Sequence, residues 1–514
     1  VSLRGIRLVT FLAELNHLEL WGADVGNAYL QAKTKEKVCI VGGPEFGNLE
    51  GHTLVIHKAL YGLRTSGLCW HQRFADVLRS MGFTPCKAEN DIWMRCANDV
   101  YEYLAVYVDD IMIAAYNPEE IVKSLETQHH FKLKGIGSLS YHLGCDYFRD
   151  ETGTLCFGPR KYIDKMVEQY ERMFGSKPKE YTSPLEKGDH PEVDTSEELD
   201  AEGIKTYQSM IGCLQWDVSI GRFDIHTATM TMSRFRMAPR KGHLERLKRI
   251  YCYLKKFNSA AIRVRTDEPD FTDLPKQKFD WCETIYGNVK EEIPKDIPPP
   301  LGNPVTLVSY VDANLYHDML TGRSVTGILH FCNQTLVDWY SKRQACVQTA
   351  TFGSEFVAAR IATDQIIDFC NTLRYLGVPV QKCSYLFGDN QAVVNNSSIP
   401  HSCLSKRHNA LFYNRVREAI AAGILSFFWI DGKNNPADIV SKHWSYQQVW
   451  QLLQPILFYS GDTSLLINEG FKDKDHAVVV QKNNTQDSNL GPHSAENKKG
   501  DDNCLKLGGN KGPP

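Results

Sequence analysis

The sequence predicts a mixed α/β (α+β) chain with several domains, and three observations support this. Short apolar runs, too brief for helices, alternate with segments of helical periodicity in residues 1–150 and again in 305–445. Prolines accumulate between these two regions, as in a semi-rigid linker. The length of 514 residues, of which 42% are hydrophobic and 23% charged, predicts about three domains with cores of their own.

Composition excludes several protein classes. No apolar stretch approaches the roughly 18 residues of a membrane helix, because the longest candidate is broken at its centre by Asp109 and Asp110. The 15 cysteines are scattered singly without a Cys-x-x-Cys pair, so we expect no disulfide framework, no zinc cluster and a reducing compartment. The chain begins at Val1 without a signal sequence, which we interpret as a fragment of a longer protein.

Residues 1–150 are expected to form the first domain. Apolar residues from Trp70 to Met81 recur at the spacing of one buried helix face. The runs 103–108 and 111–115 are too short for helices and rich in β-branched and aromatic residues. They predict two strands that pair as a hairpin with two aspartates at its turn.

Residues 151–258 are predicted to be mainly helical, with an acid-rich loop at 186–202 and a basic helix at the end. Between Thr231 and Phe257, nine lysines and arginines stand against one acid. Although the whole chain has a net charge of -3, this segment is strongly basic. Residues 259–304 lose all periodicity and are predicted to be the proline-rich linker.

Residues 305–445 are expected to form another α/β domain, and residues 446–514 a C-terminal extension that is disordered after about residue 472. The predicted elements of this domain are strands at 306–312, 324–332, 335–341, 384–388 and 423–430, and helices near 354–370, 405–422 and 436–443.

The strongest chemical signal is the pair Asp109 and Asp110, set among residues that belong in a core. Burying a carboxylate costs hydration energy unless a positive charge such as a metal ion compensates it; a solvent-facing turn is the alternative. A third acid, Asp24, lies at a predicted strand end. Three such carboxylates form an oxygen-ligand cluster suited to two Mg²⁺ ions about 3.5–4 Å apart, as in phosphoryl transfer.

A second set of four acids lies in the C-terminal domain. Asp312 and Asp389 end predicted strands, Glu355 opens a helix, and Asp438 begins the last helix. Side chains at element termini can converge from separate segments on one point. Taken singly, each acid has a plainer explanation as a helix cap or a turn residue.

In their order and spacing, three motifs resemble reverse transcriptases of copia-type LTR retrotransposons, which are made as part of a Pol polyprotein: DVGNAYL at 24–30, KALYGLR at 58–64 and YVDD at 107–110. The similarity continues with SYHLG at 140–144, which resembles the primer-grip hairpin, and with segments 221–225 and 237–240 at the end of the thumb. The four acids of the second set resemble the Asp-Glu-Asp-Asp site of ribonucleases H. Together the resemblance covers roughly residues 1–445.

The resemblance implies a reverse-transcriptase palm with truncated fingers, a thumb, and then a ribonuclease H-like domain. It implies that the three acids of the first set bind two Mg²⁺ (or Mn²⁺) ions as polymerase ligands. The four acids of the second set are implied to bind two more, and the metals there activate a water that cuts the RNA strand of a hybrid.

Substrate contacts follow from the same resemblance. Tyr29, five residues past Asp24, matches the aromatic that lies beneath the incoming sugar and excludes a 2′-hydroxyl; an ordinary strand aromatic is the alternative. Tyr107, Leu143 and Gly144 are implied to contact primer or nucleotide, although an apolar-glycine pair is often only a turn.

The basic helix is expected to contact phosphates through Arg246, Lys248 and Arg249, without sequence preference and with a strong salt dependence. A solvated helix face is the alternative. His408, in the segment SKRH, resembles a substrate-handling residue of the family, or it is a solvated loop histidine.

The sequence also departs from the family pattern. Thr65 stands where the family usually has a glutamine near the nucleotide, and Asn314 replaces the second acid of the first nuclease motif. The strands of the fingers that hold the triphosphate are absent from the sequence given.

The function that we expect is RNA-directed DNA polymerase with ribonuclease H activity. Its partners are an RNA template, a DNA primer, the RNA–DNA hybrid and deoxynucleoside triphosphates; no membrane is expected, and the oligomeric state stays open. The alternatives are a truncated relic that keeps only the nuclease and a silent remnant that binds nucleic acid. The family implies a cytoplasmic virus-like particle, and also the nucleus, as locations.

Overall fold

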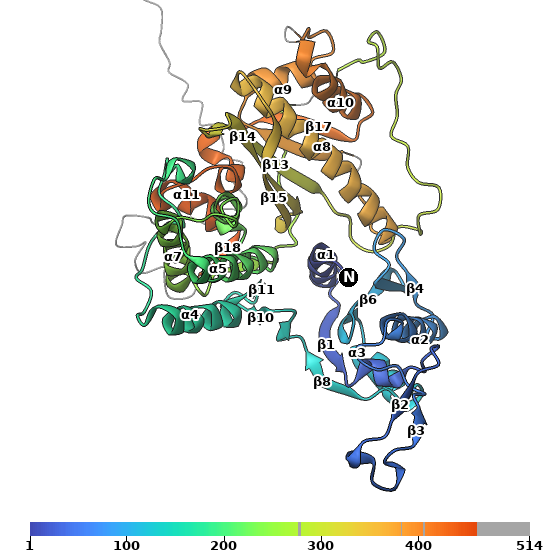
Figure 1. Ribbon diagram of the computed structural model, residues 1–514. Helices are drawn as coiled ribbons and strands as arrows, with labels where there is room; N and C mark the ends of the chain where they lie inside the picture. Colours follow the sequence, from blue (N-terminus) through green and yellow to red (C-terminus); the bar gives the residue numbers. More distant parts are fainter. Residues whose placement is uncertain (276–278, 382, 405–406, 460–514) are drawn as a thin grey trace, which may run out of the picture. The chain divides into compact units, whose positions relative to one another are not determined.

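The computed structural model describes residues 1–275, 279–381, 383–404 and 407–459. The segment predicted to be disordered, after about residue 472, lies outside the described residues. Helices and sheets alternate along the described chain, which confirms the predicted α/β (α+β) class (Figure 1). No helix in the described part is both long and apolar enough to cross a membrane.

The first region is built on a six-stranded antiparallel sheet. Its elements are α1 (Leu3–Leu15), β1 (Glu19–Val25), α2 (Ser66–Ser80), β4 (Thr84–Pro85), β5 (Ile92–Ala97), β6 (Val100–Tyr107), β7 (Asp110–Ala115), α3 (Pro118–Thr127) and β8 (Leu133–Ser138). The strand order is β4-β5-β6-β7-β1-β8. Alternate residues of β7, such as Met112 and Ile113, belong to two separate cores, because α1 covers one face and α2 and α3 cover the other. We call this region the palm.

Two predictions for the palm are confirmed. Helix α2 includes the periodic apolar residues from Trp70, and β6 and β7 form the predicted hairpin. The turn differs by one residue from the prediction. Tyr107 pairs with Asp110, so Val108 and Asp109 form the turn and Asp110 already belongs to a strand.

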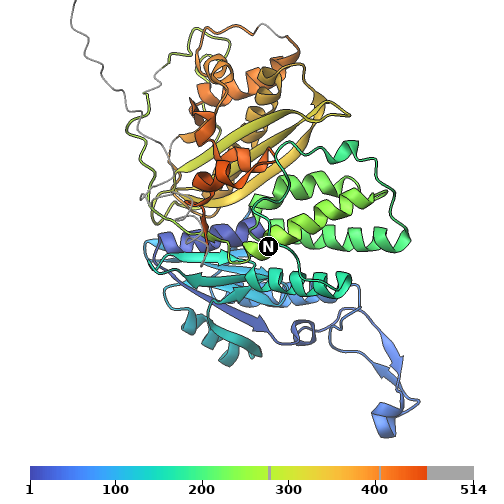
Figure 2. The ribbon, with the colours of Figure 1, turned by 90° about the vertical axis from the view of Figure 1, so that its left-hand side faces the viewer.

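A separate two-stranded hairpin is formed by β2 (Cys39–Val41) and β3 (Thr53–Val55). Figures 1 and 2 show it extending away from the palm sheet as an arm. Its strand residues are exposed except for Leu54, which is half-buried. Two strands without a covering layer have little stability of their own in water.

The middle of the chain, together with residues 446–458, combines five α-helices with a second antiparallel sheet. Its elements are β9 (Tyr141–His142), β10 (Cys145–Arg149), β11 (Leu155–Gly158), α4 (Arg160–Phe174), α5 (Ala201–Ser219), α6 (His226–Ser233), α7 (Lys241–Lys256), β12 (Ala261–Arg263), α11 (Tyr446–Leu453) and β18 (Leu457–Phe458). The strand order is β18-β12-β11-β10-β9. The predicted C-terminal extension therefore begins with ordered elements, because Trp450 and Leu457 are buried and β18 pairs with β12.

The C-terminal sheet has the strand order β15-β14-β13-β16-β17. Its elements are β13 (Leu307–Asp318), β14 (Arg323–Cys332), β15 (Thr335–Val347), α8 (Thr351–Tyr375), β16 (Ser384–Gly388), α9 (Gln391–Ser398), α10 (Ala410–Ala421) and β17 (Leu425–Trp429). The first three strands are antiparallel, and β16 and β17 run parallel to β13. Antiparallel and parallel strands therefore share one sheet, within the mixed α/β domain that the sequence predicts.

All five strands predicted for this domain are present, but two helices differ. The last predicted helix is only a 3₁₀ helix, Pro436–Val440. Helix α9 was not predicted, because its eight residues end in Asn-Asn-Ser-Ser and lack an apolar period.

Candidate active sites

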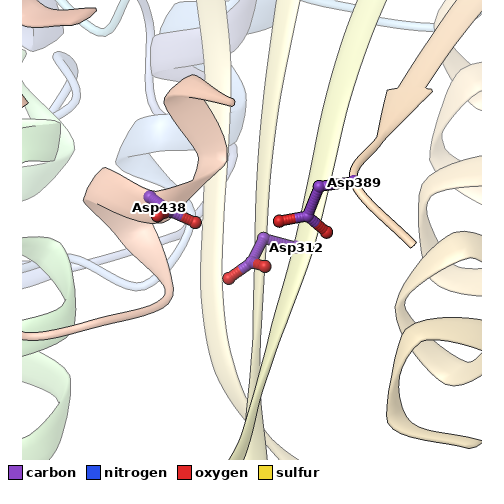
Figure 3. Close-up of side chains that lie close together, drawn as sticks. All are labelled: Asp312, Asp389 and Asp438. Atoms are coloured by element: carbon purple, nitrogen blue, oxygen red, sulfur yellow. The ribbon is translucent and has the colours of Figure 1, made fainter. Parts of the chain in front are cut away.

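Three acids of the second set lie at one edge of the C-terminal sheet. Asp312 is in β13, and Asp389 directly follows β16, which pairs in parallel with β13. Parallel strands end at the same edge of a sheet, so residues there come together. Asp438 comes from the 3₁₀ helix that follows β17. Figure 3 shows the three carboxylates gathered beside β13.

One carboxylate oxygen from each of Asp312, Asp389 and Asp438 lies within 4.8 Å of the others. In the described part of the chain, no other three acids, histidines or cysteines meet this closely. Asp312 is only 1% exposed. An all-oxygen donor set is the kind that Mg²⁺ and Mn²⁺ prefer, so the residues present fit the expected metal. We call these three residues the nuclease cluster.

The nuclease cluster carries unfavourable repulsion between its own charges. Burial, together with the charge of Asp312, raises the pKa of Asp389 to about 6 and that of Asp438 to about 7. The ammonium of Lys442 offsets part of this repulsion, since it lies 3.2 Å from Asp312 and 2.6 Å from Asp438. The hydroxyl of Ser441 donates a hydrogen bond to Asp312. A cation bound here competes with protons and with Lys442.

Glu355 lies beside the nuclease cluster but is not one of its close members. It is in the N-terminal part of α8 and is 8% exposed. Burial, followed by the charges of Asp312 and Asp389, raises its pKa well above the usual range. The structure therefore brings three of the four predicted nuclease acids together and places the fourth within electrostatic range of them.

The turn between β6 and β7 is held in a strained conformation. Val108 has a φ of +58°, which a β-branched residue rarely adopts. The Trp70 indole donates a 2.7 Å hydrogen bond to the carbonyl of Val108. The amide of Val25 donates a 2.8 Å hydrogen bond to the carbonyl of Asp109. These bonds connect the turn to α2 and β1, and so fix the position of Asp109.

Asp24 and Asp110 lie directly opposite each other on β1 and β7. Burial, followed by the charges of Asp109 and Asp24, raises the pKa of Asp110. The three palm acids are therefore neighbours, as predicted. Their oxygens do not form a group within 4.8 Å of the kind seen in the nuclease cluster. Metal binding by the palm acids stays a prediction.

Tyr29 lies in the 3₁₀ helix Ala28–Gln31 and is half-buried against the core formed with α2, so the strand placement in the alternative is wrong, and the contact with the sugar stays a prediction. Its ring centroid is 4.6 Å from that of Tyr61. Tyr61 is 60% exposed, and desolvation followed by the charge of Asp109 raises its pKa. Tyr61 was not among the predicted site residues, although its place inside the KALYGLR motif was an available signal.

Leu143 and Gly144 form the turn of a hairpin between β9 and β10. Their φ angles are +47° and +94°, as the tight turns of two-residue hairpins require. In this hairpin, Tyr141 lies close enough to Asp110 for that charge to contribute, after burial, to its raised pKa. The hairpin therefore approaches the palm acids. Tyr107 is 43% exposed at the end of β6, and its contact with substrate stays a prediction.

The cations of α7 already have partners within the chain. Arg246 forms bonds of 2.8 and 2.9 Å with Asp189 and of 2.7 Å with Asp194. Arg249 and Lys248 lie 2.8 and 2.7 Å from glutamates. The acid-rich loop supplies most of these partners. Phosphate contact by α7 stays a prediction, but the premise that its basic face is not neutralised is wrong. Counting charges along one helix leaves out acids from other segments that fold onto it.

His408 lies in the 3₁₀ turn Arg407–Asn409 before α10, and its side chain is exposed. The residues 405–406 that precede this turn lie outside the described residues. A role of His408 in handling substrate stays a prediction.

Comparison with known proteins confirms the family resemblance. Residues 1–185 match the family described as reverse transcriptase (RNA-dependent DNA polymerase). The chain is 24% identical over 453 residues to the retrovirus-related Pol polyprotein from transposon TNT 1-94 of Nicotiana tabacum, covering 86% of this chain and 31% of the relative. It is 27% identical over 300 residues to a putative transposon Ty5-1 protein of Saccharomyces cerevisiae, covering 56% of this chain and 89% of the relative.

The chain spans less than a third of two of the Pol polyproteins that it matches, 31% of that from TNT 1-94 and 27% of that from transposon RE1 of Arabidopsis thaliana. Among solved structures, it is similar to a foamy viral protease-reverse transcriptase in complex with RNA/DNA hybrid, with a TM-score of 0.40, 13% identity, and coverage of 82% of this chain and 45% of the other. It is also similar to LC11-RNase H1 in complex with RNA/DNA hybrid, with a TM-score of 0.22, 15% identity, and coverage of 26% of this chain and 94% of the other.

Proposed function

We propose that this chain is the reverse transcriptase and ribonuclease H part of a copia-type Pol polyprotein. It copies an RNA template into DNA from a DNA primer and cuts the RNA of the resulting hybrid. One observation carries the proposal: at one edge of a sheet with antiparallel and parallel strands, carboxylate oxygens of Asp312, Asp389 and Asp438 lie within 4.8 Å of one another, an all-oxygen set of the kind that Mg²⁺ prefers. The similarity of residues 1–185 to the reverse transcriptase family supports the polymerase part.

In the nuclease, the cluster acids hold two Mg²⁺ or Mn²⁺ ions, with Glu355 as a further ligand. Bound cations of this kind supply activation of water and stabilisation of the charge on the cleaved phosphate. The residues around the cluster position it. Buried Asn435 donates a 2.9 Å hydrogen bond to the carbonyl of Val311, which attaches the start of the 3₁₀ helix carrying Asp438 to β13. Lys442 neutralises part of the negative charge.

In the polymerase, Asp24, Asp109 and Asp110 are the proposed ligands of two further cations. The anchored turn supports this role, because it holds Asp109 next to the two acids that face each other on β1 and β7. Tyr29 is the proposed contact with the sugar of the incoming nucleotide, and its packing against Tyr61 supports a fixed ring position.

A second candidate function is hybrid cleavage without polymerisation. It is favoured by the difference between the two acid sets, since only the nuclease acids, among the described residues, meet as a close group.

The test compares primer extension and hybrid cleavage by the full chain in Mg²⁺ with those of Asp389→Asn and Asp109→Asn. Loss of a metal ligand costs more than the 10- to 100-fold typical of groups that only orient ligands, so we expect a loss of at least about 100-fold. Asp389→Asn loses cleavage and keeps extension, and Asp109→Asn does the reverse. Cleavage alone in the unsubstituted chain supports the second candidate. Absence of both activities refutes both functions.

A further inference from the structure

A group of cations that outnumbers its acidic neighbours lies at the base of the β2–β3 arm and in the loop before α2. We call it the hairpin-base patch, and its members are Lys33, Lys35, Lys37, Lys58 and Arg64. All five side chains are exposed. Among the described residues, none of the five lies within ion-pair distance of an acid, although the charge of Arg64 contributes to the lowered pKa of Glu36. Most cations of α7, in contrast, form ion pairs.

Backbone contacts bring the members of the patch together. Lys33 and Lys58 lie opposite each other in an antiparallel bridge. Like charges in this position repel and destabilise the pair unless an anion lies between them. The amide of Ala59 donates a 3.0 Å hydrogen bond to the carbonyl of Ala32, which continues the pairing. The ammonium of Lys35 reaches the side-chain oxygen of Gln72 on α2 at 2.5 Å.

The acid nearest to these cations is already engaged. Glu36 is the only acid within residues 33–38 and 56–64. It accepts hydrogen bonds from the hydroxyl of Thr65 and, at 2.9 Å, from the amide of Thr65. The bond from the hydroxyl is the main cause of its lowered pKa. Glu36 therefore anchors the loop that carries Arg64, and it leaves the patch with an excess of positive charge.

An exposed aromatic ring joins the patch to the palm acids. Tyr61 lies between Lys58 and Arg64 in the sequence and is 60% exposed. The charges of Asp109 and Asp24 reach its hydroxyl, as its raised pKa reflects after the effect of desolvation. The hydroxyl of Ser66 donates a 2.6 Å hydrogen bond to the carbonyl of Leu60, and this bond closes the loop that carries Tyr61.

We propose that the hairpin-base patch and Tyr61 bind the single-stranded RNA template where it reaches the palm acids. Lysines and arginines contact backbone phosphates, and an exposed aromatic ring stacks on an unpaired base; together these are the means by which proteins bind single strands without sequence preference. A duplex does not offer an unpaired base, so Tyr61 favours the single strand. This inference rests on the proposed function, because it assigns a substrate surface to the same palm.

The test measures binding of a fluorescently labelled single-stranded RNA to the full chain by anisotropy, in EDTA and at several salt concentrations. The variant combines Lys33→Gln, Lys58→Gln and Arg64→Gln. The matched control combines Lys123→Gln, Lys165→Gln and Lys290→Gln, which removes three exposed cations elsewhere. We expect the patch variant to bind at least about tenfold more weakly and to flatten the salt slope by about 2, since each phosphate contact contributes about 0.7 for single strands. The control keeps both values.

Two further arms identify the ligand. Tyr61→Ala is expected to weaken RNA binding roughly fivefold or more through lost stacking, and Tyr61→Phe to keep it. Binding of a deoxynucleoside triphosphate, measured by equilibrium dialysis, is expected to be unchanged in the patch variant. Equal RNA affinity of the patch variant and the control overturns the inference. A patch variant that loses nucleotide binding but keeps RNA binding overturns it as well. Because the assay needs no catalysis, a chain that binds RNA through the patch but extends no primer refutes the polymerase function and not this inference.

Discussion

The two acid sets of this chain differ in how far the fold assembles them. The nuclease cluster is built from the edge of a parallel strand pair and a short helix, and its oxygens meet within 4.8 Å. The palm acids lie on a turn and on two antiparallel strands, where Asp24 faces Asp110. In the nuclease cluster, Asp312 is buried and Asp389 and Asp438 are half-buried, and the ammonium of Lys442 lies 3.2 Å from Asp312. Among the described residues, carboxylates therefore meet as a close oxygen group in one domain and lie as looser neighbours in another.

The largest expected effect comes from removing one acid of the nuclease cluster. Asp438→Asn should lower hybrid cleavage by at least about 100-fold. The same change should raise the thermal midpoint in EDTA, because it removes a half-buried carboxylate whose charge is disfavoured by desolvation and by the charge of Asp312. Calorimetry and a cleavage assay on the same preparation check both. A fall in both activity and midpoint would mean that the acid acts by supporting the fold.

The pH dependence of folding stability should show the repulsion within the nuclease cluster, which the comparison with the palm acids depends on. The pKa values of Asp389 and Asp438 are raised to about 6 and about 7 from an ordinary value of 3.8. The folded chain therefore holds protons that the unfolded chain has released, so this contribution to stability is lost as pH rises from about 4 to about 7. In EDTA, the thermal midpoint should be higher at pH 5 than at pH 8, and Mg²⁺ should raise it at pH 8 more than at pH 5.

The control for this pH effect is the double variant Asp389→Asn, Asp438→Asn, in which the difference between the two pH values should shrink. An unchanged difference would assign the pH dependence to groups outside the cluster.

A smaller effect is expected from Lys442→Met. Two partly exposed ion pairs are lost, so the chain in EDTA should be less stable by about 1 kcal/mol, or about 2–4 °C in the midpoint of a domain of this size. The stabilisation by Mg²⁺ should increase, because the cation no longer competes with Lys442. Lys433→Met, at an exposed site nearby, is the control. Equal Mg²⁺ stabilisation in both variants would contradict a competing role.

The smallest effect on nucleic-acid binding is expected at α7. Arg246→Gln should change the affinity for single-stranded RNA by less than about twofold, because Arg246 is already paired with Asp189 and Asp194. It should instead lower the free energy of unfolding, since two acids lose their partner. Anisotropy and denaturant titration check the two parts. A tenfold loss of RNA affinity with stability kept would restore the phosphate contact predicted from the sequence.

Local patterns were enough to predict much of the fold and of the acid sets. The strands of the C-terminal sheet follow from apolar runs, and Asp389 was placed correctly because it directly follows such a run. Asp312 was expected at a strand end, but β13 continues to Asp318. Glu355 was expected to join the cluster, yet whether three or four oxygens meet depends on the packing of α8, which no local pattern contains.

Long-range pairing explains the other differences. The charge of α7 was misjudged because Asp189 and Asp194, about 50 residues earlier in the chain, fold back onto Arg246. The ordered start of the C-terminal extension depends on β18 pairing with β12, almost 200 residues away in sequence. Short elements have too few apolar residues to show a period, and their stability comes from such partners.

The most direct test of the central claim is a titration of the metal-free full chain with Mn²⁺, followed by electron paramagnetic resonance. We predict that Asp389→Asn loses a class of bound Mn²⁺ that the unsubstituted chain and Asp109→Asn both retain. Mn²⁺ binding by Asp389→Asn that equals that of the unsubstituted chain would contradict the assignment of Asp312, Asp389 and Asp438 as a cation site.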